Sequence, residues 1–423
     1  MGKQLKIIFC ALWLAVYPAW GAEPAQLPGA GVEELLALAQ QHNPELAAMR
    51  LEAGAAEERI HSAGALPDPM LRAELMDITN AGTNAPPSLL PNRVGSTRYS
   101  VIQAVPFWGK RDLKREMAEA EANQAQGRAS LTWTELSARI KTDFAQYYLL
   151  IRSGKLTQEI LGLLISLERI AQARYATGLA AQQDVIRAQV ELTGLRRELV
   201  MLEADQHHAM ARLNTLLRRA PDAPLAEPQR LRPIPDSATL HYAALEDRLR
   251  AKNPQLFTID AQVAASEKNR ELVLKNRYPD FIFGLSPTQM GGQIKEWGLM
   301  VELNIPLQQQ TRRAQEREAD TMLTAARSRK EAALNQLLGD LAENVSGLDA
   351  ARRVETLTAT SLQPQAEATF QAALSGYQTG KVDFATLLDA QRQILKAKLD
   401  VLNAQAEAQA RLAEIEKILG EEL

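Results

Sequence analysis

The sequence predicts a mainly helical protein with a small β part, built from two tandem repeats of two long helices and two strands each. The first observation is a duplicated motif, Tyr-x-Thr-Gly, which begins at Tyr175 and again at Tyr377 between long helical patterns. The second is composition, because aromatic residues make up only 5% of the 423 residues, as is typical of long helices. The two motifs are 202 positions apart, so the other elements are expected to recur at about that offset.

Residues 1–21 are expected to form a signal peptide that directs export. Two lysines precede an apolar run from Ile7 to Val16, and a small-x-small cleavage signal follows at Ala19-Trp20-Gly21. The single cysteine, Cys10, lies inside the apolar run, whereas a lipid-attachment cysteine directly follows such a run. The exported chain is therefore expected to carry no lipid anchor, disulfide or thiolate metal site.

Charge and hydropathy narrow the classes of partner. The formal net charge is -3, from 48 basic and 51 acidic residues, which gives no electrostatic case for nucleic-acid binding. Beyond the leader, no stretch approaches the roughly 18 continuous apolar residues of a spanning helix. If the chain crosses a membrane, strands must do so.

The first repeat is expected to occupy residues 22–222. A first helix is predicted over 31–65, from apolar residues at helical spacing. A long helix is predicted over 110–175, a stretch without proline that would extend on the order of 100 Å. The return helix, 181–219, carries apolar residues at seven-residue steps as in a coiled coil. A proline-rich linker over 223–238 follows it.

Two antiparallel strands are predicted between these helices, over 70–78 and 97–105. The first strand alternates in polarity, with apolar residues on one face and charged residues on the other: Leu71, Ala73 and Leu75 against Arg72 and Glu74. The segment between the strands is rich in Pro, Gly, Asn and Ser, which suits strands joined at an exposed end.

The second repeat, residues 239–423, is expected to contain the same elements in the same order. Asn43-Pro44 returns as Asn253-Pro254, and Val105-Pro106 returns as Ile305-Pro306. The coiled-coil seam of the return helix recurs at the same offset as the tip motif, which chance similarity would not produce. The predicted elements are a helix over 239–277, strands over 281–286 and 297–305, a long helix over 308–375 and a return helix over 383–420.

The strand over 297–305 shows the clearest alternation. Its apolar face carries Trp297, Leu299, Val301, Leu303 and Ile305, and its other face is mostly small or polar. An apolar face with an aromatic end, opposite a polar face, is what lipid outside and water inside require of an exported strand. These five residues are therefore predicted to face lipid.

Four strands per chain are too few for a closed transmembrane barrel, which needs about eight or more. We therefore expect the barrel to be shared between chains. Alanine-rich seams let helix backbones approach closely, so the helices are expected to continue the barrel as a tube about 100 Å long.

With these motifs in this order, the chain resembles the outer-membrane efflux proteins of the TolC type, the exit ducts of tripartite efflux pumps and type I secretion. The resemblance covers the whole mature chain. It rests on the duplicated Asn-Pro-Glu/Gln-Leu, on Pro-Asp before the first strand of each repeat, on the strand-Pro ends and on the two tips. Leu66-Pro67-Asp68-Pro69 and the segment 105–111 look most like the ducts of heavy-metal exporters of the resistance-nodulation-division (RND) class.

The resemblance implies a homotrimer, with a 12-stranded β-barrel in the outer membrane continued by a periplasmic α-helical barrel in a Gram-negative bacterium. Such a duct would pass metal cations or small toxic compounds from an inner-membrane RND-type transporter and a periplasmic adaptor (membrane fusion) protein to the exterior. Its partners would be further copies of itself, the adaptor, the transporter and outer-membrane lipid. No cofactor is implied.

The resemblance also implies roles for the two tips. The adaptor-docking motif matches Arg174, Tyr175 and Gly178 in the first tip and Tyr377 and Gly380 in the second. The periplasmic gate matches Asp184, Tyr377 and Asp389, and Lys381 is assigned to it as the basic residue next to the position where the family has one. Three Asp389 carboxylates converging on the axis of a trimer would favour cations.

The second tip departs from the pattern of the family at three positions. Gly376 stands where the docking motif has arginine, and Thr386 replaces a second aspartate of the gate. The basic position of the gate falls on Val382, with Lys381 beside it, so an ionic latch of the usual form is not expected.

Other interpretations stay open. Asp389 is equally well explained as a solvated helix residue, the two tyrosines as turn packing, and the two glycines as helix C-caps. A periplasmic coiled-coil adaptor or scaffold would not need the lipid-facing strand, and a porin-like channel would need more strands. A duct for type I protein secretion is a further alternative. No nucleophile-base arrangement, metal-ligand spacing or phosphate loop occurs, so no enzyme activity is expected.

Overall fold

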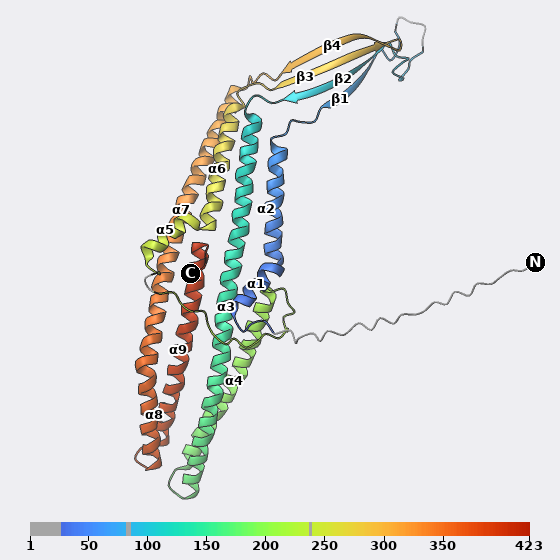
Figure 1. Ribbon diagram of the computed structural model, residues 1–423. Helices are drawn as coiled ribbons and strands as arrows, with labels where there is room; N and C mark the ends of the chain where they lie inside the picture. Colours follow the sequence, from blue (N-terminus) through green and yellow to red (C-terminus); the bar gives the residue numbers. More distant parts are fainter. Residues whose placement is uncertain (1–26, 82–85, 237–238) are drawn as a thin grey trace, which may run out of the picture.

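The computed structural model describes residues 27–81, 86–236 and 239–423. It is elongated, with a four-stranded sheet at one end, a body of long helices, and two helical hairpin tips at the other end (Figure 1). The predicted signal peptide lies outside the described residues. Within the described ranges, no helix is both long enough and apolar enough to span a membrane.

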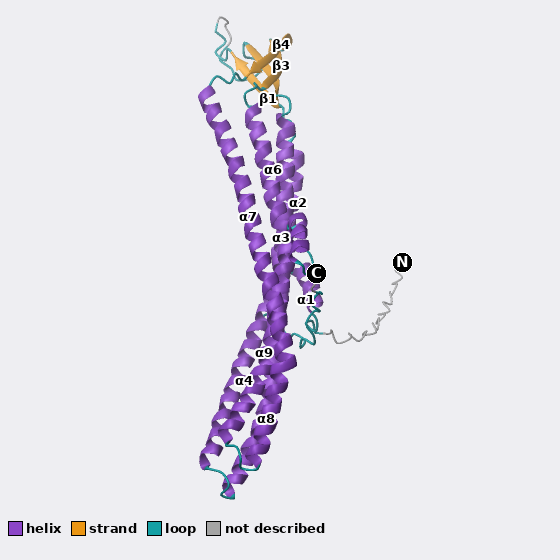
Figure 2. Cartoon of the chain, turned by 90° about the vertical axis from the view of Figure 1, so that its left-hand side faces the viewer, coloured by secondary structure: helices purple, strands orange, loops and turns teal. Residues whose placement is uncertain are grey.

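The helices follow the predicted order in both repeats (Figure 2). The first repeat contains α1 (Val32–His42), α2 (Pro44–Ala63), α3 (Lys110–Ala176) and α4 (Gln182–Leu216). The second contains α5 (Tyr242–Lys252), α6 (Pro254–Lys275), α7 (Gln309–Leu357), a π-helical turn η1 (Thr358–Leu362), α8 (Gln363–Gln378) and α9 (Phe384–Leu419). The predicted helix over 110–175 is therefore continuous, as expected.

The single helices predicted over 31–65 and 239–277 are wrong, because each is broken at an Asn-Pro pair. Asn43 and Asn253 have extended backbone, which the following proline favours, and their side chains cap the next helix. Their Nδ2 groups donate to the carbonyl oxygens of Leu216 and Ile418, at 3.0 and 2.6 Å. The duplicated motif thus turns the chain and satisfies the C-terminal end of a return helix in each repeat.

The long helix predicted over 308–375 is also interrupted. The turn η1 separates α7 from α8 and ends two residues before Pro364, which lies in the first turn of α8. Proline has no N–H to donate and its ring clashes with the preceding turn, so a regular helix cannot pass through it. The corresponding part of α3 has no proline and runs without a break.

The strands are β1 (Met70–Met76), β2 (Ser96–Val105), β3 (Phe281–Met290) and β4 (Gln293–Leu303). β3 extends four residues beyond its predicted end, and β4 begins earlier and leaves Ile305 outside the strand. The extensions of both strands meet at a two-residue turn, Gly291 and Gly292, both with positive φ, which joins the strands as a tight hairpin.

All four strands pair antiparallel in the order β1-β2-β3-β4. One cross-strand row consists of Leu71, Val101, Leu285 and Leu299, which lie directly opposite one another and therefore on the same face of the sheet. All four are exposed. The sheet thus presents one continuous apolar face, while Arg72, Glu74 and Arg98 lie on the other.

The hydrophobic core is divided into three clusters along the body. Two lie in its middle, one for each repeat. The third joins both hairpins near the tips, through residues such as Leu164, Leu192, Phe370 and Leu387. Gln206 on α4 donates from Nε2 to the carbonyl of Leu150 on α3 at 3.0 Å. The two repeats therefore share one core at the tip end of the molecule.

The paired helical tips as candidate functional site

The two tip turns have the same backbone structure. Gly178 and Gly380 have φ of 73° and 76°, a left-handed conformation that glycine adopts most easily. In the first tip the N–H of Leu179 donates to the carbonyl of Arg174 at 2.8 Å, and in the second Lys381 donates to Gly376 at 2.8 Å. These bonds close both helices as glycine C-caps. The Tyr-x-Thr-Gly motif therefore encodes the turn itself.

Arg174 connects the first tip to the second. Its Nη1 donates to the carbonyl of Gln378 at 2.7 Å, and its Nη2 donates to the carbonyl of Leu179 at 3.3 Å. The guanidinium carbon lies 5.0 Å from the ring centroid of Tyr377, within the range of a cation–π contact. The side chain predicted to dock an adaptor is thus engaged between the tips of its own chain.

The two tyrosines of the repeated motif have different surroundings. Tyr377 is only 3% exposed and packs against Phe384, with ring centroids 5.2 Å apart. Its hydroxyl is buried and makes no hydrogen bond to any described residue. Tyr175 is 46% exposed. The first tip therefore presents its tyrosine outward, whereas the second uses its tyrosine for packing.

Asp184 lies in the same electrostatic environment as Tyr377. Burial raises the pKa of Asp184, and the charge of Asp383 adds to this effect, while Arg187 opposes it. Burial and the charge of Asp184 together raise the pKa of Tyr377. Asp184 is thus near enough for its charge to act on the Tyr377 hydroxyl, although no hydrogen bond joins these two predicted gate residues.

The other two predicted gate residues are solvated in the single chain. Lys381 is exposed and has no ion-pair partner among the described residues. Asp389 is exposed and lies 3.4 Å from Arg392, one helical turn away. Arg392 in turn pairs with Glu191 through two contacts, of 3.0 and 2.5 Å, and so links α9 to α4. Sequence reasoning missed this pair, because a seam pattern does not show which faces of two hairpins meet.

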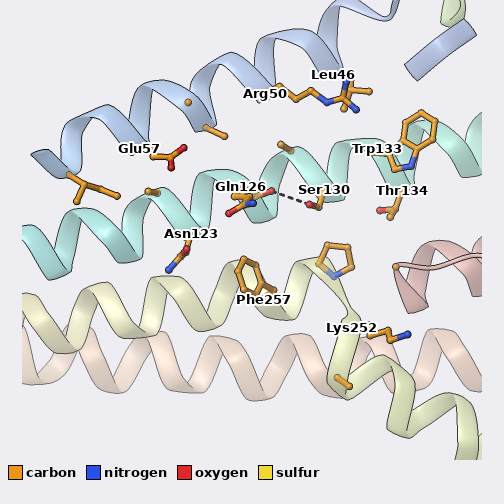
Figure 3. Close-up of a pocket in the computed structure, with 18 residues that line it drawn as sticks. Leu46, Arg50, Glu57, Asn123, Gln126, Ser130, Trp133, Thr134, Lys252 and Phe257 are labelled. Atoms are coloured by element: carbon orange, nitrogen blue, oxygen red, sulfur yellow. Dashed lines mark hydrogen bonds between the residues drawn. The ribbon is translucent and has the colours of Figure 1, made fainter. Parts of the chain in front are cut away.

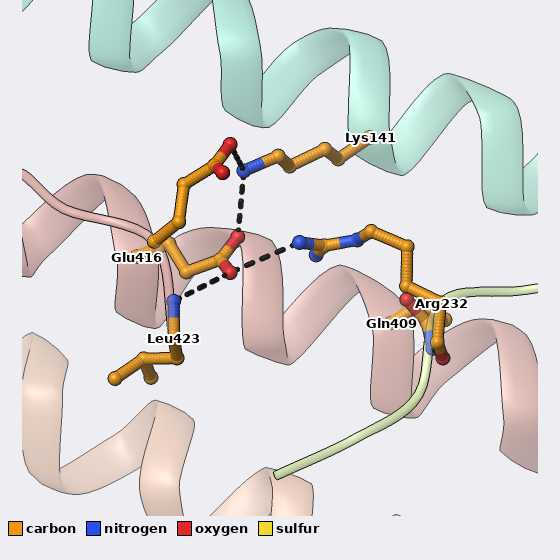
Figure 4. Close-up of polar contacts among 6 residues, drawn as sticks. Lys141, Arg232, Gln409, Glu416 and Leu423 are labelled. Carbon is orange, nitrogen blue, oxygen red and sulfur yellow. Dashed lines mark hydrogen bonds and ion pairs between the residues drawn. The ribbon is translucent and has the colours of Figure 1, made fainter. Parts of the chain in front are cut away.

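A buried ion cluster in the middle of the body was also missed (Figure 4). Lys141 and Glu416 are each 4% exposed, and Lys141 Nζ lies 2.9 Å from Glu416 Oε2. Arg232 of the linker reaches Glu416 Oε1 at 2.9 Å, and Glu422 reaches Lys141 at 3.0 Å. Burial opposes ionisation of Glu416, but its bond with Arg232 and the nearby Lys141 outweigh burial and lower its pKa. The cluster joins α3, the linker and α9.

Hollows also lie along the helical body. Figure 3 shows one of about 810 Å³, between α2, α3 and α6, with Arg50, Glu57, Gln126, Ser130 and Phe257 at its wall. Its polar groups make no nucleophile-base arrangement. Among the residues that the structure describes, no three metal-ligating side chains gather as a metal site. The hollow is a groove between packed helices.

The residues predicted to face lipid are all exposed in the single chain. Trp297, Leu299, Val301 and Leu303 lie along one face of β4, and Ile305 follows its end. They lie opposite β3 residues of the same face, such as Phe283 and Leu285. The far end of the molecule from the tips is therefore apolar on one side.

Comparison with known proteins supports this arrangement. The chain is 25% identical over 413 residues to the cobalt-zinc-cadmium resistance protein CzcC of Cupriavidus metallidurans, covering 96% of this chain and 92% of that protein. It is 23% identical over 343 residues to the pyoverdine export outer membrane protein OpmQ of Pseudomonas aeruginosa, covering 77% and 68%.

A similar fold occurs in the outer membrane protein VceC of Vibrio cholerae, with a TM-score of 0.79 and 18% identity over 92% of this chain and 96% of that chain. The model of the family described as "Outer membrane efflux protein" matches residues 35–217 and 245–421, most of both repeats. The chain therefore belongs to the outer membrane efflux protein family, which makes it a Gram-negative outer-membrane efflux channel and not an enzyme.

Proposed function

We propose that three copies of this chain form the exit duct of a tripartite efflux pump, which carries substrates from an inner-membrane RND-type transporter and a periplasmic adaptor to the exterior. The observation that carries the proposal is the division of the molecule. One end is a sheet with an exposed apolar face, the other end carries two equivalent turns, and long helices separate them.

The open edges of the sheet support a trimer. β1 pairs only with β2 and β4 only with β3 among the described strands, so each chain has two free strand edges. Free edges of exposed strands pair readily with another chain. Three copies joined edge to edge provide twelve strands, within the range of outer-membrane barrels, with the row from Leu71 to Leu299 facing lipid.

The repeated turns support docking of the adaptor at the tips. Gly178 lies in open space, with no atom within 4 Å of the position that a Cβ would take. Tyr175 and Leu179 are exposed beside it. Three copies present six turns of one backbone shape, so six copies of one adaptor segment would find near-equivalent sites. Arg174 then shapes the docking surface by holding Gln378 and Tyr377 in place.

We place the periplasmic gate at the same level of the molecule. Asp184 and Tyr377 influence each other electrostatically, and the Arg174 side chain holds the two tips together. Asp389 and Lys381 are exposed and available to the lumen or to a neighbouring chain. Movement of one tip away from the other requires that the contacts of Arg174 break.

Metal cations are the substrates that we favour. The relative CzcC is named for resistance to cobalt, zinc and cadmium, and its similarity covers nearly the whole of both chains. OpmQ is named for export of pyoverdine, a different kind of molecule, and its similarity covers less of each chain.

The test is complementation of a Gram-negative strain that lacks its own metal-efflux duct and expresses the matching adaptor and transporter. Restored growth in cobalt, zinc or cadmium, together with a trimer in the outer-membrane fraction and crosslinks from Tyr175 to the adaptor, is the expected result. A properly inserted trimer that forms no adaptor crosslink and restores no export would overturn the proposal.

A further inference from the structure

We propose that the junction between the sheet and the helices binds the phosphate headgroups of anionic phospholipids in the periplasmic leaflet of the outer membrane. This inference rests on the proposed function, because that function sets how the sheet is oriented in the outer membrane. It assigns a ligand to a cluster of basic and aromatic side chains that neither the tips nor the gate uses.

Exposed tryptophans mark both ends of the apolar face. Trp297 lies opposite Pro287 near the hairpin end of β3 and β4. Trp108 is 73% exposed at the helical end, where its ring contacts Phe281 edge to face at 5.6 Å. Phe281 and Pro287 are six positions apart, which is about 20 Å of strand. Because strands in outer-membrane barrels are tilted by roughly 40°, this length covers about 15 Å of the roughly 25 Å apolar band that aromatic girdles flank, and Trp108 lies beyond Phe281 at the helical end.

Further aromatic side chains continue this face towards the helices. The ring of Phe107 stacks on Tyr278, with centroids 4.5 Å apart, and lies 5.4 Å from Trp108. Tyr278 is half exposed. An apolar ring with a polar tip is suited to the boundary between acyl chains and headgroups. The junction therefore lies at the level of the headgroups.

Basic residues concentrate at the same level. The helix ends and connections next to the sheet carry eight cationic side chains: Lys110, Arg111, Lys114, Arg115, Lys275, Arg277, Arg312 and Arg313. The same segments carry only three acidic side chains, Asp68, Asp112 and Asp280, and the adjoining helical turns add Glu116, Glu119, Glu271 and Glu316. The hairpin end of the sheet is balanced, with Lys295 beside Glu296 and Arg93 near Asp77. The basic excess is thus confined to one end.

Most of these cations have no carboxylate partner. Lys110 pairs with Asp280, Arg277 with Glu316, and Arg115 with acidic neighbours on its own helix. The other five have no carboxylate within 4.0 Å among the described residues: Arg111, Lys114, Lys275, Arg312 and Arg313. A group of cations of this size without close carboxylate partners, beside a membrane surface, attracts anionic lipid.

Lys275 joins the basic and aromatic groups directly. Its Nζ donates to the carbonyl of Trp108 at 3.3 Å, so the ammonium lies at the base of the exposed ring. Gly109, next to Trp108, has φ of 77°, a left-handed conformation that favours glycine, and a Cβ there would push this ammonium away. A lipid whose acyl chains pack on Trp108 would place its phosphate near Lys275.

The test compares lipids retained by the purified full-length trimer in native mass spectrometry, using dioleoyl phosphatidylglycerol against dioleoyl phosphatidylcholine. The expected result is a preference for phosphatidylglycerol that weakens with salt. Each basic side chain near an anionic surface contributes roughly a fivefold gain in binding. The triple variant Lys114→Gln, Lys275→Gln and Arg313→Gln should therefore lower the preference at least about tenfold.

The control of equal charge is Arg169→Gln with Arg196→Gln and Arg197→Gln, three exposed arginines on α3 and α4 far from the sheet, and it should keep the preference. Equal retention of the two lipids by the wild-type trimer, or an unchanged preference in the triple variant, would overturn the proposal. Retention of lipid A phosphates in place of phosphatidylglycerol would also overturn it. Metal resistance measured in parallel separates this failure from failure of the duct, because a working pump without lipid preference refutes only the headgroup site.

Discussion

Arg174 in the first tip lies over the ring of Tyr377 in the second, with its guanidinium carbon 5.0 Å from the ring centroid. The two residues are equivalent to Gly376 and Tyr175 under the repeat, so the contact exists in only one direction. The duplicated tips are alike in backbone and unlike in side chains. The first tip supplies the cation, Arg174, and the second tip supplies the ring, Tyr377. Equivalent positions of the two repeats therefore have different roles.

Replacing Arg174 with alanine should loosen the tips. The variant loses the cation–π contact and two hydrogen bonds to carbonyl groups, together roughly 1–3 kcal/mol. We expect larger or more frequent openings of single channels in planar bilayers. Tyr175→Ala is the control, because that side chain is exposed and makes no contact between the tips. Unchanged conductance in the Arg174 variant would mean that its contacts do not restrain the tips.

Replacing Asp389 with alanine should lower the preference of the channel for cations or raise its conductance. Three carboxylates near a common axis attract cations, and their loss should change the permeability ratio by a few-fold. Reversal potentials in salt gradients measure this ratio. Asp205→Ala, an exposed aspartate on α4 far from the tips, is the matched control. Equal permeability ratios and conductances for the two variants would mean that Asp389 is only a solvated helix residue.

Replacing Gly178 with proline should abolish pump function and leave the trimer folded. Proline fixes φ near -65° and has no N–H, whereas Gly178 has φ of 73° and donates to Tyr175 at 3.0 Å. The damage should stay local, because the turn is exposed at the end of the molecule. Metal resistance and trimer content are the measurements. Gly194→Ala, within α4 and with open space around it, should keep both. Wild-type resistance in the proline variant would exclude docking at this turn.

The order of the elements could be predicted from sequence because periodicity and turn motifs are local. The helix breaks could have been predicted as well, since Asn43 and Asn253 each precede a proline and both act as caps. The Gly291-Gly292 hairpin was a similar local signal. The spacing of apolar residues continues across both Asn-Pro pairs, so a prediction from spacing alone joins two helices into one.

The contacts between repeats could not be predicted in the same way. Arg174 and Gln378 are 204 positions apart, and Lys141 and Glu416 are 275 apart. A seam shows which residues face the partner helix of the same hairpin, but not how one hairpin is rotated against the other. The side chains that depend on this rotation, including Glu191 and Arg392, were therefore found only in the structure.

The buried cluster around Glu416 should make stability depend on pH. Its pKa is lowered from the usual value of 4.5 because Arg232 and Lys141 favour the carboxylate, against the effect of burial. A carboxyl with a lowered pKa in the folded state contributes stability above its unfolded pKa. That contribution is lost as pH falls through the folded value. Thermal unfolding should therefore show a loss of stability from about pH 4.5 downward, and Glu416→Gln should reduce this dependence.

Removing one partner of the cluster should cost far more than removing a surface pair. Lys141→Met leaves the buried Glu416 with Arg232 as its only cationic partner among the described residues, and breaking a buried pair in this way costs roughly 3–5 kcal/mol. Lys155→Met is the control, because Lys155 and Glu227 lie 2.5 Å apart but are both exposed, and such pairs contribute about 1 kcal/mol or less. Replacing Lys141, Arg232 and Glu416 together by apolar residues should restore much of the loss, since no buried charge is then left unpaired. Equal melting temperatures for the Lys141 and Lys155 variants would show that the cluster does not hold α3 to α9.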